Sequence, residues 1–115
     1  MKKLIISVGL ITLFASGQAF AAMSKAEIED KILGKTFKFQ TTSGATGKVK
    51  HSKNGKSRLS NTNFDPKRDS GTWRFKGSKH CISWNKVRGG KEKCFSYTDN
   101  GDGTYRTHDG TKLSR

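Results

Sequence analysis

Acidic residues are scarce in this sequence. Its 115 residues include only 9 Asp and Glu against 23 Lys and Arg, so the formal net charge is +14. Apolar residues are also few, at 31% of the chain, and many of them lie in the first twenty positions. This composition excludes a transmembrane protein and a long helical repeat array, and it argues against a large enzyme with an elaborate buried cleft. The length suits one small domain.

The one long apolar run lies at the N-terminus and has the pattern of a signal peptide. Lys2 and Lys3 precede about eleven largely apolar residues, 4–14, far fewer than the roughly 20 that a membrane-spanning helix needs. Small residues at Ala19 and Ala21 suit the pockets of a signal peptidase, which predicts cleavage after Ala21. No cysteine follows the apolar run, so we expect no lipoprotein anchor.

The expected mature chain is a single small β-rich domain, residues 22–115, left after removal of the signal peptide, residues 1–21. Two of the 23 basic residues lie in the removed segment, so the net charge falls from +14 to +12. We expect this domain to be periplasmic or secreted and to have no transmembrane segment. Its aromatic residues and its two cysteines argue against the disorder that so few aliphatic residues would otherwise suggest.

Cys81 and Cys94 are the only cysteines. In an exported protein they are expected to form a disulfide, which contributes about 3 kcal/mol to a domain with a thin core. A redox-active pair is the less favoured alternative, because redox motifs usually space their cysteines C-x-x-C. A metal site would need further ligands, and only His51, His80 and His108 could add soft ones. We therefore expect neither a metal nor a cofactor.

The first element after the cleavage site is a predicted short helix. Ser24 and Glu27 have the spacing of a capping box, in which each side chain bonds the other residue's backbone amide. Ile28 and Ile32 follow at helical spacing, and Gly34 supplies a stop signal. The apolar stripe is expected to pack against a sheet, although a partner-binding helix is an alternative.

Beyond this helix the apolar residues alternate with polar ones, which indicates strands. Small-residue turns separate the alternating segments, among them Asn54-Gly55 and the residues 99–103, while residues 61–70 read as an irregular connection. The expected fold is mainly β: a short N-terminal helix followed by a small antiparallel β-barrel or curved sheet of six or seven strands, with one disulfide. The predicted strands are residues 36–41, 48–51, 56–60, 71–75, 80–84, 93–97 and 104–107.

The cysteines also predict which side chains form the core. If Cys81 lies opposite Cys94 in an antiparallel hairpin, the alternating residues around them share the opposite face of the sheet. These residues are Ile82, Trp84, Phe95 and Tyr97. We expect that face to be the core and the disulfide to lie on the other. Trp73 and Trp84 are both expected to be core residues rather than platforms for stacking on a ligand.

Several of these segments resemble a family of small exported proteins of proteobacteria, common in alphaproteobacteria and of unknown function. The family pattern is a helix with the form A-E-I followed by Gly, then G-x-W, C-x-x-W and C-[FY] strands and a final D-G pair. The matching segments here are Ala26-Glu27-Ile28 with Gly34, Gly71-Thr72-Trp73, Cys81-Ile82-Ser83-Trp84, Cys94-Phe95 and Asp109-Gly110. The resemblance implies a periplasmic or secreted β-rich domain and no particular activity.

The basic residues gather in two clusters, which are the candidate anion-binding residues. One cluster comprises Lys48, Lys50, Lys53, Lys56 and Arg58, and the other centres on Lys86, Arg88, Lys91 and Lys93 and adds Arg74, Lys76 and Lys79. Basic stripes near aromatic residues are typical of polyanion binding. We expect a non-enzymatic module that binds anionic envelope components or polymers such as lipopolysaccharide, acidic glycan or nucleic acid. The alternative is a solvated charged surface without a ligand.

Two other classes of function remain as alternatives. A protein-interaction module, such as an inhibitor of an envelope enzyme, could present residues 85–93 as a loop held by the disulfide. A secreted basic nuclease or toxin could use His51 and His80 as acid and base with Lys79 or Lys93. No nucleophile elbow or suitably placed carboxylate pair supports hydrolase chemistry, and residues 99–103 lack the spacing of a calcium loop. We therefore expect no enzyme activity and no catalytic residue.

Overall fold

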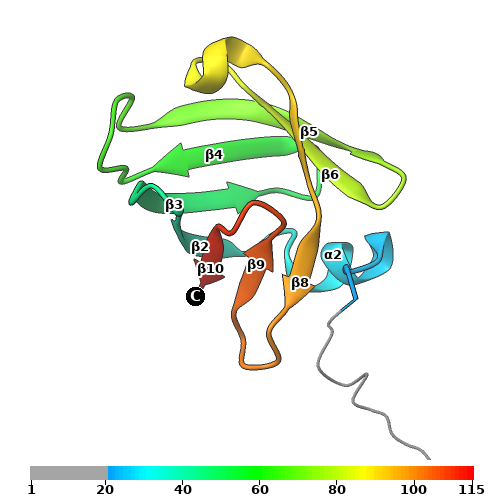
Figure 1. The fold of residues 1–115 in the computed structure, drawn as a ribbon. Coiled ribbons are helices and arrows are strands. Elements are labelled where there is room, and N and C mark those ends of the chain that lie inside the picture. The colour runs from blue at the N-terminus through cyan, green and yellow to red at the C-terminus, as the bar shows by residue number, and fades with distance from the viewer. Residues whose placement is uncertain (1–20) are drawn as a thin grey trace, which may run out of the picture.

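The computed structural model describes residues 21–115, so the predicted signal peptide lies outside the described residues except for Ala21. The protein is mainly β, with one short α-helix before nine strands (Figure 1), which confirms the predicted fold class. The elements are α2 (Lys25–Lys31), β2 (Thr36–Gln40), β3 (Thr46–His51), β4 (Lys56–Ser60), β5 (Asp69–Lys76), β6 (Lys79–Trp84), the 3-10 helix η2 (Val87–Gly90), β7 (Lys93–Phe95), β8 (Tyr97–Asp99), β9 (Tyr105–Thr107) and β10 (Lys112–Ser114).

The nine strands form one antiparallel sheet that curls into a nearly closed barrel. Their order is β7-β6-β5-β4-β3-β2-β10-β9-β8. The two strands at the ends of this order, β7 and β8, are separated in the chain only by Ser96. The amide of His108, just after β9, donates to the Ser96 carbonyl at 3.0 Å. The chain therefore crosses directly from one end of the sheet to the other and brings the ends together.

Helix α2 has the predicted capping box and packs against the barrel. The Ser24 hydroxyl accepts from the Glu27 amide at 3.2 Å, and the Ser24 amide donates to the Glu27 carboxylate at 2.8 Å. Ile28 and Ile32 are fully buried against the barrel core. Gly34 ends the segment with a φ of +81°, a left-handed conformation that favours glycine. Its amide donates to the carbonyl at the end of β3, so the helix is joined to the sheet.

Two features differ from the predicted strands. Residues 93–97 do not form one strand, because the chain leaves β6 at Ser96 and begins to pair with β9 at the opposite end of the sheet. Residues 112–114, for which no strand was predicted, form β10, which lies between β2 and β9. A segment of three residues is too short for alternation to be visible, so its pairing depends on the barrel around it.

The core face of the sheet is the predicted one. Cys81 pairs directly with Cys94, and the neighbouring side chains Ile82, Trp84 and Phe95 point into the barrel. Tyr97, on β8, joins them inside at 3% exposure. The disulfide lies on the outer face, as expected from the alternation of side chains along a strand.

The helices among residues 21–115 are short. α2 has seven residues and η2 has four, and neither is long and apolar enough to cross a membrane.

Candidate functional site

A continuous basic surface, here called the basic face, covers the outside of neighbouring strands. Along each strand, apolar residues such as Phe37 on β2 and Leu113 on β10 point inward, so the residues next to them point outward. The strands involved are β4, β3, β2, β10 and β9, which are adjacent in the sheet. The basic face consists of seven exposed side chains: Lys38, Lys48, Lys50, Lys56, Arg58, Arg106 and Lys112.

The strand register places like charges opposite one another on this face. The directly opposed pairs are Lys38 with Lys48, Lys50 with Arg58, and Lys112 with Arg106. Like charges in such positions destabilise a sheet. The four ion pairs formed within residues 21–115 involve none of these seven residues. Within the described part of the chain, none of these opposed charges is therefore neutralised by a direct ion pair.

A shallow hollow of about 390 Å³ lies within the basic face. Three of the lysines that line it come from three neighbouring strands: Lys38 from β2, Lys48 from β3 and Lys112 from β10. The amide side chains of Gln40 and Asn61 line it as well. Ammonium and amide groups are hydrogen-bond donors, so the hollow offers the chemistry that a phosphate, sulfate or carboxylate group needs.

The predicted first cluster belongs largely to this face. Lys48, Lys50, Lys56 and Arg58 lie on it, whereas Lys53 is exposed in the turn between β3 and β4. Sequence reasoning did not select three members of the face. Lys38 could have been found from the alternation of residues 36–41, which places its side chain on the other face of the strand from Phe37 and Phe39. Arg106 and Lys112 could not be placed beside it, because β10 was not predicted.

The predicted second cluster lies mainly around η2 and β7, and its members Arg74 and Lys76 lie on β5, which pairs with β4 of the basic face. Lys86 and Lys91 flank η2 and are exposed. The Arg88 guanidinium lies 5.9 Å from the centre of the Phe95 ring. Lys93 forms an ion pair with Asp109 at 2.7 Å, between β7 and the β9–β10 turn. The two clusters nevertheless adjoin, because Arg58 of the basic face and Lys86 beside η2 line the same hollow.

Asp69 holds the η2 loop in place. One carboxylate oxygen accepts hydrogen bonds from the amides of Lys86 and Val87, each at 2.9 Å, and the other accepts from the amide of Ser70. Burial alone would raise the pKa of Asp69, but these backbone donors together lower it. The carboxylate therefore stays charged and fixes the position from which Arg88 projects.

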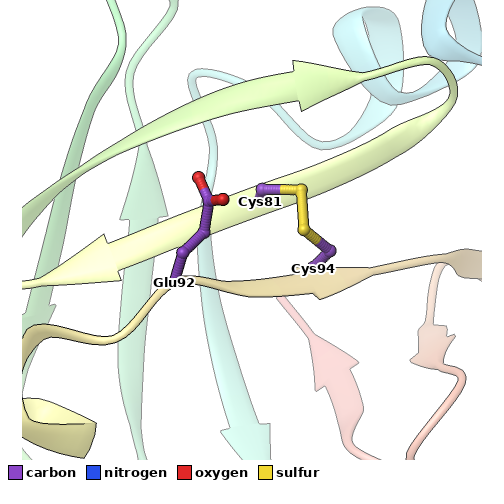
Figure 2. A group of neighbouring side chains, drawn as sticks. All are labelled: Cys81, Glu92 and Cys94. Atoms are coloured by element: carbon purple, nitrogen blue, oxygen red, sulfur yellow. A yellow bond between two sulfur atoms is a disulfide. The ribbon is translucent and has the colours of Figure 1, made fainter.

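The disulfide lies beside the carboxylate of Glu92 (Figure 2), within a group whose sulfur and oxygen atoms lie within 4.8 Å of one another. Both sulfurs are joined in the Cys81–Cys94 disulfide, which confirms the predicted pairing. Arg74 binds Glu92 through two hydrogen bonds of 2.8 and 2.9 Å, and Lys76 adds an ion pair at 3.2 Å. The hydrogen bonds from Arg74 chiefly lower the pKa of Glu92 to about 2. The group is thus fully engaged in contacts within the protein.

Two of the three histidines meet inside the barrel. The rings of His51 and His80 are perpendicular, with centres 4.6 Å apart. His51 Nδ1 bonds the Ser57 hydroxyl and His80 Nδ1 bonds the Tyr97 hydroxyl, both at 2.7 Å. Burial lowers the pKa of His51 well below its usual value and that of His80 to about 4. Both rings are therefore neutral near pH 7, and the exposed Lys79 is not hydrogen-bonded to either.

The tryptophans are packed within the fold rather than offered to solvent. Trp84 is 7% exposed and belongs to the core cluster with Leu59 and Ile82. Trp73 packs against the core and donates from its indole nitrogen to the Ser52 carbonyl at 2.8 Å. Trp84 is therefore closed to stacking on bases or sugars, whereas Trp73 remains partly exposed.

The acidic turn at residues 99–103 is a hairpin turn between β8 and β9. The Asp99 carboxylate accepts from the amide of Gly101 at 2.8 Å and forms an ion pair with Lys31 of α2 at 3.0 Å. Asp102 accepts from the Thr104 amide. These carboxylates are occupied in shaping the turn and in fastening the helix to it.

An apolar cavity of about 140 Å³ inside the barrel was not foreseen from the sequence. It lies among aromatic and aliphatic side chains from most of the strands, including Phe37, Val49, Leu59, Trp84 and Phe95. Alternation predicted Trp84 and Phe95 as core residues, but only the curvature of the sheet decides whether a core is filled or leaves space. Comparison of the chain with protein-family models, curated proteins and solved structures finds no match in any of the three.

Proposed function

We propose that this protein is an exported, non-enzymatic β-domain that binds an anionic envelope component or polymer electrostatically through its basic face. The observation that carries the proposal is the set of three directly opposed like-charge pairs, none of whose members forms an ion pair within residues 21–115. An anionic ligand that bridges such pairs removes their repulsion and adds its own attraction. Lipopolysaccharide, acidic glycans and nucleic acid all carry closely spaced anionic groups that could bridge these pairs.

The site of action is proposed to be the periplasm or the exterior of the cell. The signal-peptide pattern of residues 1–21 supports export. The disulfide supports an oxidising compartment, since such bonds persist mainly outside the cytosol. The high positive charge gives long-range attraction to the phosphates of an envelope surface or a released polymer.

A nuclease role receives no support from the position of the histidines. His51 is 5% exposed and His80 is fully buried, so a polymer backbone cannot reach the two rings as they are placed. An inhibitor role likewise receives no support, because no contact among residues 85–93 points to a protein partner.

The test measures retention of the oxidised mature protein on heparin, lipopolysaccharide, DNA and the neutral glycan dextran at increasing salt. We expect binding to the three polyanions only, with the binding constant for DNA falling steeply as salt rises. The triple variant Lys48→Gln/Lys50→Gln/Arg58→Gln should elute at clearly lower salt. For DNA, the slope of log K against log salt should become shallower by up to about three units.

The matched control is Lys25→Gln/Lys79→Gln/Lys91→Gln, which removes the same charge from exposed positions outside the basic face. This variant should keep most of the affinity. Equal losses in the two variants would mean that net charge alone drives retention. Absence of binding at physiological salt would refute the proposal.

A further inference from the structure

The barrel cavity is apolar at depth and reaches the surface at one end. Its inner lining includes Ile32 and Phe37, which are almost completely buried. Toward the end of the barrel that carries η2, the lining passes to the half-exposed Phe64 and Val87 and to the exposed Asp109. A buried apolar space with one polar opening is the usual form of a small-molecule site.

The volume limits the size of an occupant. An engineered protein cavity of about 150 Å³ with a comparable lining stays dry and binds benzene. The cavity here, about 140 Å³, therefore has room for a single six-membered ring or an alkyl chain of similar bulk. The acyl chain of a membrane lipid is too large for it.

The charge at the opening decides which end of an occupant faces outward. Lys93 and Asp109 neutralise each other in an ion pair, and the Thr107 hydroxyl also binds Asp109. Arg88 has no ion pair within residues 21–115. Arg88 does not itself line the cavity, but it follows Val87 at the opening, and its guanidinium lies over the ring of Phe95, which does line the cavity. The opening thus carries one cation in surplus beside an apolar interior.

The backbone at Arg88 is in an unusual conformation. Its φ of 56° and ψ of 26° lie in the left-handed region, where a residue other than glycine is strained by about 1–2 kcal/mol. Hydrogen bonds from the Lys86 and Val87 amides to Asp69 fix the start of this loop. Burial also lowers the pKa of Arg88, with Asp109 opposing the shift. An anion at this position would offset the cost of partly burying the guanidinium charge.

We propose that the barrel cavity binds a small carboxylate whose single ring or short alkyl chain enters the apolar interior while its carboxylate pairs with Arg88 at the opening. A carboxylate buried at depth would lose its hydration without a cationic partner, so the ligand has one orientation. This site is independent of the basic face, and either proposal can fail without the other.

The test uses benzoate and hexanoate as probes, with benzyl alcohol as a neutral molecule of similar size. Binding to the oxidised protein is measured by titration calorimetry and by the quenching of tryptophan fluorescence, since Trp84 lines the cavity. We expect saturable binding of both carboxylates with Kd below about 1 mM. Benzyl alcohol should bind more weakly, and palmitate should not compete with benzoate.

Two kinds of variant assign the site. Arg88→Ala should weaken benzoate binding roughly tenfold or more, because a charge-assisted hydrogen bond is lost, and should leave benzyl alcohol unchanged. Arg58→Ala, on the basic face, removes the same charge and should have no effect. Val49→Phe places a ring in the cavity and should abolish binding of both carboxylates. If Val49→Phe does not fold, Val87→Phe is used instead, because its larger side chain should block the opening and abolish binding of both carboxylates.

Three results would overturn this assignment. The first is no saturable binding of either carboxylate by the wild-type protein. The second is equal binding of benzoate and benzyl alcohol, unchanged in Arg88→Ala. This result would show that the cavity does not recognise the carboxylate group. The third is unchanged benzoate binding in folded Val49→Phe or Val87→Phe protein, which would place the binding site elsewhere.

Discussion

The buried histidines are the residues whose chemistry contrasts most with their surroundings. His51 and His80 lie within a predominantly apolar interior, and each forms one side-chain hydrogen bond, to Ser57 and to Tyr97. The Nε2 atom of His80 has no hydrogen-bond partner among the described residues. Nearby lie the rings of Trp73 and Phe75, the former almost perpendicular to His80. Protonation of either imidazole would place a charge in this enclosed space, which makes the pair sensitive to acid.

We expect the free energy of unfolding to fall as the pH is lowered from about 6.5 to 4.5. Burial lowers the pKa of His80 from 6.5 to about 4 in the folded state, so the unfolded chain binds more protons across this window. Above pH 6.5 the histidine is neutral in both states, so the free energy of unfolding is not reduced. Between pH 6.5 and pH 4 it falls progressively. The lowered pKa of His80 alone accounts for a loss of about 2.5 kcal/mol by pH 4.5, and His51 adds to it.

Urea unfolding of the oxidised protein at several pH values measures this loss, and histidine NMR titration assigns it. His108→Asn is the control, because His108 is exposed, and its pH dependence should match that of the wild type. The carboxylates with lowered pKa values act mainly below pH 4.5, so they do not account for a change at higher pH. Constant stability between pH 7 and 4.5 would contradict the prediction.

At the scale of elements, the pairing of β5 with β6 depends on one glycine. Gly71 lies opposite Trp84 in the register. A Cβ at Gly71 would lie 2.2 Å from the Ser83 carbonyl oxygen and 2.9 Å from the Trp84 Cα atom. Both contacts are with backbone, which cannot move aside as a flexible side chain can. The two strands approach so closely here because this residue has no side chain.

Gly71→Ala is therefore expected to destabilise the protein by about 2 kcal/mol or more, because the strands must separate to admit the methyl group. The midpoint of urea denaturation measures the effect. Ser70→Ala, at the exposed neighbouring position, is the matched control and should change stability by less than about 0.5 kcal/mol. Equal stability of Gly71→Ala and the wild type would show that the strands can accommodate a side chain there.

At the scale of the whole molecule, the barrel depends on contacts between the two ends of the sheet. β7 is only three residues long, and its pairing with β6 includes the disulfide. From β7, Lys93 reaches Asp109 in the β9–β10 turn, and Ser96 bonds His108. The disulfide thus holds in place the strand from which the chain crosses to the opposite end of the sheet.

Reduction of the disulfide is expected to cost about 3 kcal/mol of stability, because it frees a loop of this length in the unfolded chain. Urea unfolding with and without a reducing agent measures the difference. The double variant Cys81→Ala/Cys94→Ala should match the reduced protein and should not respond to the reducing agent. If the reduced wild type were as stable as the oxidised protein, the disulfide would have no stabilising role.

The local structure was largely predictable from the order of residues. Ser24 and Glu27 predicted the helix start, and the alternation of Phe37 and Phe39 with polar residues predicted a strand and its buried face. Cys81 and Cys94 predicted both their bond and the orientation of the residues beside them. These predictions succeed because capping and alternation depend on residues within a few positions of one another.

Features that join distant segments were decided only by the tertiary structure. Three features depend on how the whole sheet is paired and curled. They are the place of β10 between β2 and β9, the contact between His51 and His80, and the apolar cavity. The pairing of β10 with β2 also brings Lys112 near Lys38 and so completes the basic face. The order of residues was enough to predict the charge, most local elements and the inward face. Curvature of the whole sheet, which no short segment encodes, decided which charges and rings became neighbours.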